Sequence, residues 1–297
     1  MNRNRKGVVA YLLIAFGLAW AGFEAMYRSK GLPLRAGGVV VSAFAPAVAC
    51  FVVRKWVTRE GFADAGLRLH LRKWPYYLLA WLLPIAVVAC IVILSPIFGA
   101  STADFSLDRG FRYLASVGKP VPSWAPHSLL PLLCIWLIQA IVTVPIFFGE
   151  EFGWRGYLQK RLFPESPALS AVITGLIWGA WHLPANLRGY NFPDDPILGS
   201  LVVFPVSCIF MSIIFGWLVQ TTGSIWSSSL AHAATNNIGG DLVLILFGGG
   251  ANFLYVGYVG LLGWIPLGAL SAWIVFTGQL KPAAEALHEM AQRAQAG

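Results

Sequence analysis

Apolar stretches long enough to cross a lipid bilayer recur along this chain of 297 residues. We count eight of them, with ends defined to about 2–4 residues: 8–27, 37–53, 76–98, 128–150, 168–186, 197–219, 224–247 and 254–277. A helix needs about 20 apolar residues to cross the hydrocarbon. The stretches are continuous rather than alternating, which favours helices over a β-barrel. The sequence therefore predicts an all-α bundle of about eight transmembrane helices, forming a single domain over residues 1–297.

The low charge content agrees with a membrane protein. Only 11% of the residues are charged and 57% are hydrophobic, whereas a soluble domain carries about 25% charged residues. This composition excludes a disordered chain, a coiled coil and nearly every soluble enzyme. The net charge of +8 is not gathered in one patch but flanks the apolar stretches, so we expect the lipid bilayer as a partner and no nucleic acid. We predict an integral, multi-pass protein of the plasma membrane.

The distribution of Lys and Arg predicts an orientation. With the N-terminus inside, thirteen of them fall in the inner connections and termini and seven in the outer connections, leaving aside Arg155 at the end of an apolar stretch. Because inner loops carry the excess of positive charge, we expect both termini on the cytoplasmic side.

Two adjacent carboxylates, Glu150 and Glu151, stand at the end of the fourth apolar stretch, where charge is costly. Glu151 precedes Arg155 by four residues, the favourable order for a helical ion pair. Glu150 has no such partner, so in an apolar setting beside Glu151 its charged form should be disfavoured, which suits a general base. Solvated glutamates at the membrane interface are the alternative.

Two further apolar stretches contain histidines. The fifth carries Trp178…His182, and the seventh carries His232 followed four residues later by Asn236. A lone histidine is more often a core residue bonded to a carbonyl, and a small polar patch is common as interhelical glue. At 1.5 Å per helical residue, however, Glu150 and these residues lie about 13–22 Å from connections on one side of the membrane. This shared depth favours an active site.

With these residues the chain resembles the CPBP (CAAX protease and bacteriocin-processing, Rce1-like) family of intramembrane proteases. Its motifs EExxxR, FxxxH and HxxxN/D lie in this order on successive helices. Glu150-Glu151…Arg155 and His232…Asn236 match the first and third, and Trp178…His182 matches the second with Trp in place of Phe. The resemblance covers about residues 128–240 and implies a catalytic core over about 128–247.

The resemblance implies an endopeptidase of the CAAX prenyl protease type. Glu150, assisted by His182, would activate water, while His232 and Asn236 would hold the polarised carbonyl. Glu151 and Arg155 would form a structural pair, with Glu151 also assisting the chemistry. Trp178 would support the wall of the site and affect packing more than chemistry. A water-filled cavity open to the cytoplasmic side would admit a peptide or protein substrate, either lipidated or membrane-bound.

The sequence leaves the cofactor and two other functions open. Glu150, Glu151, His182 and His232 could bind Zn²⁺ or another divalent metal, but a metal-free mechanism fits equally well, and no H-E-x-x-H motif is present. A non-catalytic membrane protein for binding or immunity could use the same polar cluster, as could a transporter. Asp241 and Glu24 stay unassigned.

Overall fold

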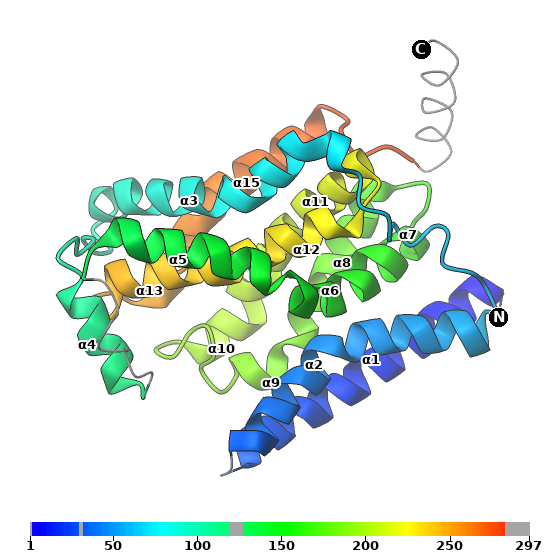
Figure 1. Cartoon of the computed structure of the whole chain (residues 1–297), viewed down its shortest axis with the longest axis horizontal. Helices are drawn as coiled ribbons and strands as arrows, with labels where there is room; N and C mark the ends of the chain where they lie inside the picture. The colour runs from blue at the N-terminus through cyan, green and yellow to red at the C-terminus, as the bar shows by residue number, and fades with distance from the viewer. Residues whose placement is uncertain (1, 30–31, 119–126, 283–297) are drawn as a thin grey trace.

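The computed structural model describes residues 2–29, 32–118 and 127–282, and it folds them into helices without a strand (Figure 1). The α-helices are α1 (Arg3–Arg28), α2 (Leu32–Val52), α3 (Trp74–Ile97), α4 (Asp108–Ser116), α5 (Leu129–Val142), α6 (Val144–Gly153), α7 (Gln159–Leu162), α8 (Pro167–Trp181), α9 (Leu183–Asn186), α10 (Pro196–Leu198), α11 (Phe204–Thr222), α12 (Ile225–Ala234), α13 (Asp241–Phe247), α14 (Phe253–Val256) and α15 (Leu261–Phe276). The wider π-helical turns are η1 (Val53–Val57), η3 (Trp154–Leu158), η4 (Gly199–Val203) and η5 (Thr235–Gly240), and η2 (Leu71–Lys73) is a 3₁₀ turn.

The all-helical, multi-pass class is confirmed. Among the described residues, five helices are long and apolar enough to span a membrane: Arg3–Arg28, Gly37–Val57, Leu71–Ile97, Pro196–Thr222 and Phe253–Phe276. A sixth span arises if Leu129–Val142 and Val144–Leu162 count as one, with a bend of 50° between them. Pro145 lies in the first turn after this bend, where proline removes a backbone donor.

The two remaining apolar stretches are helical but do not meet the criteria for a span. Helix α8 has only 15 residues and ends at Trp181, shortly before Pro184. The stretch 224–247 runs through α12, η5 and α13, but its serines, asparagines, His232 and Asp241 dilute its hydropathy. The first stretch is thus too short in its helical part, and the second is weakened as a span by the polar residues of the predicted site.

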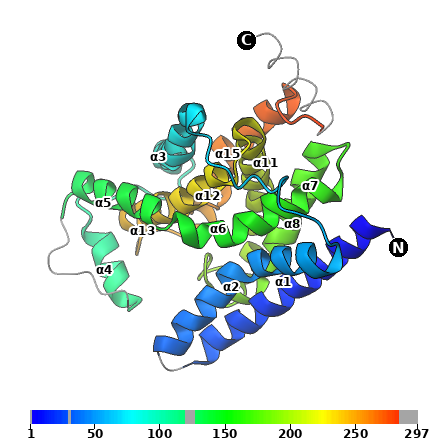
Figure 2. The ribbon, with the colours of Figure 1, turned by 45° about the vertical axis from the view of Figure 1, so that its right-hand side comes forward.

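The helices that carry the three motifs lie in the middle of the bundle. Figures 1 and 2 show α6, α8 and α12 between the α1–α2 hairpin on one side and α3 and α15 on the other. Helix α2 packs on α6, and α11 packs on both α8 and α12. This placement removes the motif residues from the periphery.

Paired glycines bring two motif helices into close contact with their neighbours. A Cβ atom on Gly149 would lie 2.5 Å from the Ala43 carbonyl oxygen of α2, and one on Gly153 would meet Pro46 of the same helix. A Cβ on Gly175 would lie 2.5 Å from Cα of Ile209 in α11. Gly149 and Gly153 flank the two glutamates, and Gly175 pairs with Gly179 in the same Gly-x-x-x-Gly spacing, which permits close helix packing in membranes. The close contacts therefore hold the backbone of α6 against α2 and the backbone of α8 against α11.

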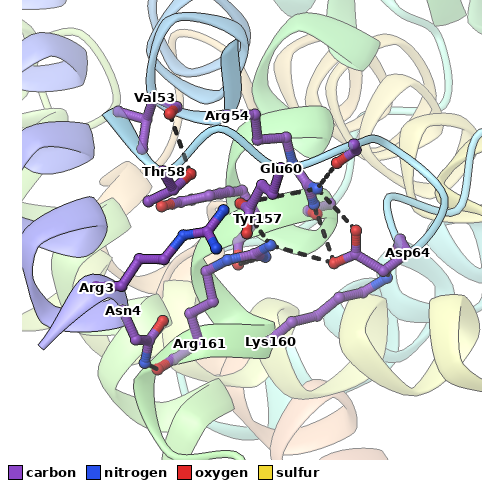
Figure 3. Close-up of polar contacts among 12 residues, drawn as sticks. Arg3, Asn4, Val53, Arg54, Thr58, Glu60, Asp64, Tyr157, Lys160 and Arg161 are labelled. Carbon is purple, nitrogen blue, oxygen red and sulfur yellow. Dashed lines mark hydrogen bonds and ion pairs between the residues drawn. The ribbon is translucent and has the colours of Figure 1, made fainter. Parts of the chain in front are cut away.

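A buried arginine fastens the connection after α2 to the turn η3 (Figure 3). Arg54 is fully buried and donates hydrogen bonds to both carboxylate oxygens of Asp64, at 2.7 and 3.1 Å. It also donates to the carbonyl oxygens of Gly61 at 2.6 Å and Gly156 at 2.9 Å. Arg161 donates to Asp64 from the other side at 3.2 Å. Because Gly156 lies in η3, this network braces the turn that follows the two glutamates.

Candidate active site

Three helices bring the predicted site residues into one polar cluster. Helix α6 contributes Glu150 and Glu151, the C-terminal end of α8 contributes His182, and α12 with η5 contributes His232 and Asn236. Glu150, Glu151 and His232 are buried, with exposed fractions of 7%, 0% and 4%. His182 is half-buried and Asn236 is exposed. A buried charged group is stable when it is paired or hydrogen-bonded. Glu150, Glu151 and His232 all have such partners.

The Glu151 carboxylate contacts two side chains, Arg155 and His232. Its Oε1 accepts a hydrogen bond from Nη1 of Arg155 at 2.9 Å, so the predicted ion pair is present in the structure. The same oxygen lies 3.0 Å from Nδ1 of His232. A carboxylate can only accept here, so Nδ1 of His232 carries the proton and donates it. The Nε2 atom of His232 is thereby left for chemistry.

Glu150 accepts a hydrogen bond from a tryptophan. Nε1 of Trp178 lies 2.8 Å from Oε2 of Glu150, and both side chains are buried. The guanidinium of Arg155 lies over the Trp178 ring, 4.6 Å from its centroid. The substitution of Phe by Trp in the second motif was expected to affect packing, and the structure adds a polar contact to it.

His182 is oriented by the end of its own helix. Its Nδ1 lies 3.0 Å from the carbonyl oxygen of Trp178, one of the last-turn carbonyls that a helix leaves without an internal partner. A carbonyl only accepts, so Nδ1 bears the proton and the neutral ring has its lone pair on Nε2. Glu150 and His182 are close enough for their charges to interact.

Asn236 reaches a cavity of about 540 Å³ that is also lined by Phe147, Tyr190 and Asp241. Its Nδ2 donates to the His232 carbonyl oxygen at 3.1 Å, and an amide nitrogen has a second hydrogen to offer. The cavity places Asp241 in its wall, which the sequence could not do. It lies among α4, α13 and the 189–193 loop, at the end of the molecule away from the N-terminus (Figure 1).

A second cavity, of about 480 Å³, lies at the end of the molecule near the N-terminus and is lined by Arg155, Gln159, Lys160 and Gln220. This cavity lies at the end predicted to be cytoplasmic, but among the predicted site residues its lining includes Arg155 rather than a catalytic residue, whereas Asn236 lines the first cavity. With the N-terminus inside, the cavity at Asn236 would face the opposite side.

One residue next to the third motif was missed at the sequence level. Asn237 donates to the side chain of Thr143 at 2.8 Å and to the carbonyl oxygen of Ala233 at 2.8 Å. Thr143 lies at the break between α5 and α6, so this bond ties the bend before the glutamates to η5. The doubled asparagine 236–237 in an apolar stretch was the available signal.

The four residues considered for a metal do not form a metal site in this arrangement. Within residues 2–29, 32–118 and 127–282, no group of three or more His, Cys, Asp or Glu side chains could hold a metal ion. Oε1 of Glu151 is shared by Arg155 and His232, and Oε2 of Glu150 accepts from Trp178. Since the donor set does not fit, we derive no step through a metal.

The fold and the cluster define a multi-pass integral membrane protein with a buried carboxylate–histidine site. Residues 125–238 match the family model described as type II CAAX prenyl endopeptidase Rce1-like. The CAAX prenyl protease 2 of Methanococcus maripaludis is 25% identical over 240 residues, which are 77% of this chain and 79% of that protein. All three predicted motifs fall within residues 125–238, so this region is similar to the Rce1-like (CPBP) family of proteases, as the motifs predicted.

Proposed function

We propose that this chain is an intramembrane endopeptidase that hydrolyses a peptide bond with water activated by Glu150 and His182. One observation carries the proposal. Both histidines have Nδ1 engaged, His182 with the Trp178 carbonyl and His232 with Glu151, so Nε2 is the nitrogen of each ring left for chemistry. Both rings lie against the Trp178 side chain that bonds to Glu150. A polar glue patch has no need to leave the reactive nitrogens unengaged.

In the proposed reaction, Glu150 takes a proton from water while Nε2 of His182 accepts the water's second hydrogen bond. His232 and the second amide hydrogen of Asn236 donate to the carbonyl oxygen as it becomes an oxyanion. For Nε2 of His232 to donate while its Nδ1 faces Glu151, the ring must carry both protons, and the Glu151 carboxylate stabilises that cation. Glu150 then passes its proton to the leaving amine.

The names of the family and of the relative suggest the substrate class. We propose a membrane-bound protein or peptide with a prenylated C-terminal CAAX motif. All eight apolar stretches would enter the membrane as one domain over residues 1–297, with the catalytic core over 128–247. Both termini would be cytoplasmic, in the plasma membrane, and the substrate would enter through a cavity open to the cytoplasmic side.

The substitution Glu150→Gln tests the proposal. It keeps the size of the side chain and its hydrogen bond to Trp178, but it removes the base, so peptidase activity should fall about 10²–10⁴-fold. The full-length protein is reconstituted in liposomes and given a prenylated CAAX peptide, and new amino termini are measured. Glu165→Gln, at an exposed glutamate, is the matched control and keeps wild-type activity.

Two results would reject the proposal. One is a well-folded wild-type protein that cleaves no prenylated or unprenylated peptide. The other is a Glu150→Gln variant that keeps full activity. This result is expected if the chain is a non-catalytic binding protein or a transporter. Metal content, measured together with activity before and after chelation, reports separately on the cofactor.

A further inference from the structure

The Trp178 side chain contacts four ionisable residues of the cluster: Glu150, Arg155, His182 and His232. The Trp178 indole N–H bonds to Glu150, and its ring lies under the guanidinium of Arg155. Ring centroids of Trp178 and His232 are 5.1 Å apart, and those of Trp178 and His182 are 5.9 Å apart. Only 2% of Trp178 is exposed.

The indole N–H is a donor only, and a buried one needs an acceptor. Here the acceptor is Oε2 of Glu150, which leaves Oε1 of the same carboxylate to meet water. This bond therefore sets the direction of the base.

The main chain of Trp178 acts on the second reactive group. Its carbonyl oxygen accepts from Nδ1 of His182 and so determines which nitrogen carries the lone pair. Gly175 and Gly179 hold this helix against α11 at Ile209 and Pro205, which keeps both contacts of Trp178 in place.

We infer that Trp178 is a positioning residue for the proposed hydrolysis: its N–H aims Glu150, and its carbonyl selects the tautomer of His182. The inference rests on the proposed function. The other titratable or charged groups near Glu150 come from several elements and stay unchanged when only the N–H is removed. They are Tyr11, Glu151, Arg155, His182, Tyr190, Cys208 and His232.

The test removes the indole N–H of Trp178 without changing the shape of the side chain. Trp178 is replaced by β-(3-benzothienyl)alanine, an isostere of tryptophan that has sulfur in place of the N–H, and W178F is made as a genetically encoded version. Full-length protein in liposomes is given a prenylated CAAX peptide, and kcat and KM are measured. We expect kcat to fall about tenfold, the effect of losing one hydrogen bond to a charged group, with KM nearly unchanged.

Trp181 offers a matched control. It is also buried, and its N–H donates to the Ala15 carbonyl oxygen at 3.2 Å rather than to a carboxylate. The same isostere at 181 should leave both kcat and KM unchanged. An unchanged kcat for the 178 isostere, or an equal loss of kcat at 181, overturns the inference while the loss of activity in Glu150→Gln still supports the protease. Activity retained in Glu150→Gln would instead overturn the proposed function itself.

Discussion

Replacing Arg54 by Met should loosen the turn that follows the two glutamates. Methionine keeps much of the arginine stem but removes the guanidinium, and with it four hydrogen bonds to Asp64, Gly61 and Gly156. These bonds join the connection after α2 to η3, where Arg155 lies.

The size of the effect follows from what each partner loses. The Asp64 side chain is 54% exposed and keeps its contact with Arg161, so water replaces much of what it loses, at a cost of about 0–1 kcal/mol. Gly61 is exposed, so its carbonyl oxygen accepts a hydrogen bond from water instead. Gly156 is buried, and its unpaired carbonyl costs about 1–3 kcal/mol. Removing a buried cation relieves its own desolvation, so we expect a net loss of roughly 1–3 kcal/mol of stability.

Thermal unfolding of the full chain in detergent measures this loss. At about 2 °C per kcal/mol, the low end for a chain of this size, Arg54→Met should melt roughly 2–6 °C below wild type. Lys55→Met removes the neighbouring exposed cation and should melt at the wild-type temperature. Arg54→Lys keeps the positive charge but lacks the planar guanidinium with its several donors, so its melting temperature should lie between those of Arg54→Met and wild type. If Arg54→Met and Lys55→Met melt together, the network does not brace η3 and the reasoning is refuted.

Two further predictions concern pH and packing. Burial opposes ionisation of Asp64, but the hydrogen bonds and charge of Arg54, helped by Arg161 and Lys160, outweigh it and lower the pKa of this carboxyl below 3.8. The stability it contributes is present above that ordinary value and is lost as pH falls below it, so the Tm difference between wild type and Asp64→Asn should shrink there; a constant difference would contradict this. Gly175→Ala places a Cβ 2.5 Å from Cα of Ile209 and should lose about 1–3 kcal/mol. Gly17→Ala, with nothing within 4 Å, should melt no lower than wild type, and equal losses at both sites would refute the packing argument.

Local geometry explains which parts of the site could be predicted. Glu151 and Arg155 are four residues apart, and the helix itself brings them to 2.9 Å. The meeting of three motifs was predicted from helix rise and alternating topology, and the structure brings Glu151 to 3.0 Å from His232 and Trp178 to 2.8 Å from Glu150. The Gly-x-x-x-Gly pairs at 149–153 and 175–179 were visible in the sequence and would have predicted which faces pack.

Contacts between distant residues were not predictable in the same way. The Trp178 N–H reaches a carboxylate 28 residues away, and Arg54, a cation that follows the second apolar stretch, is fully buried against Gly156. Asn237 and Thr143 meet across 94 residues. Each contact depends on the rotation of one helix against another, which hydrophobicity does not specify.

The sequence by itself determined the helical membrane class and the residue types of the site, because a bilayer leaves few ways to satisfy the backbone and makes each retained charge conspicuous. Tertiary structure decided which nitrogen of each histidine is left for chemistry, where Glu150 is aimed and which stretches are too short or too polar to count as spans. These properties depend on hydrogen bonds that form only after the helices pack, since a side chain's partner is chosen by distance and angle rather than by position along the chain.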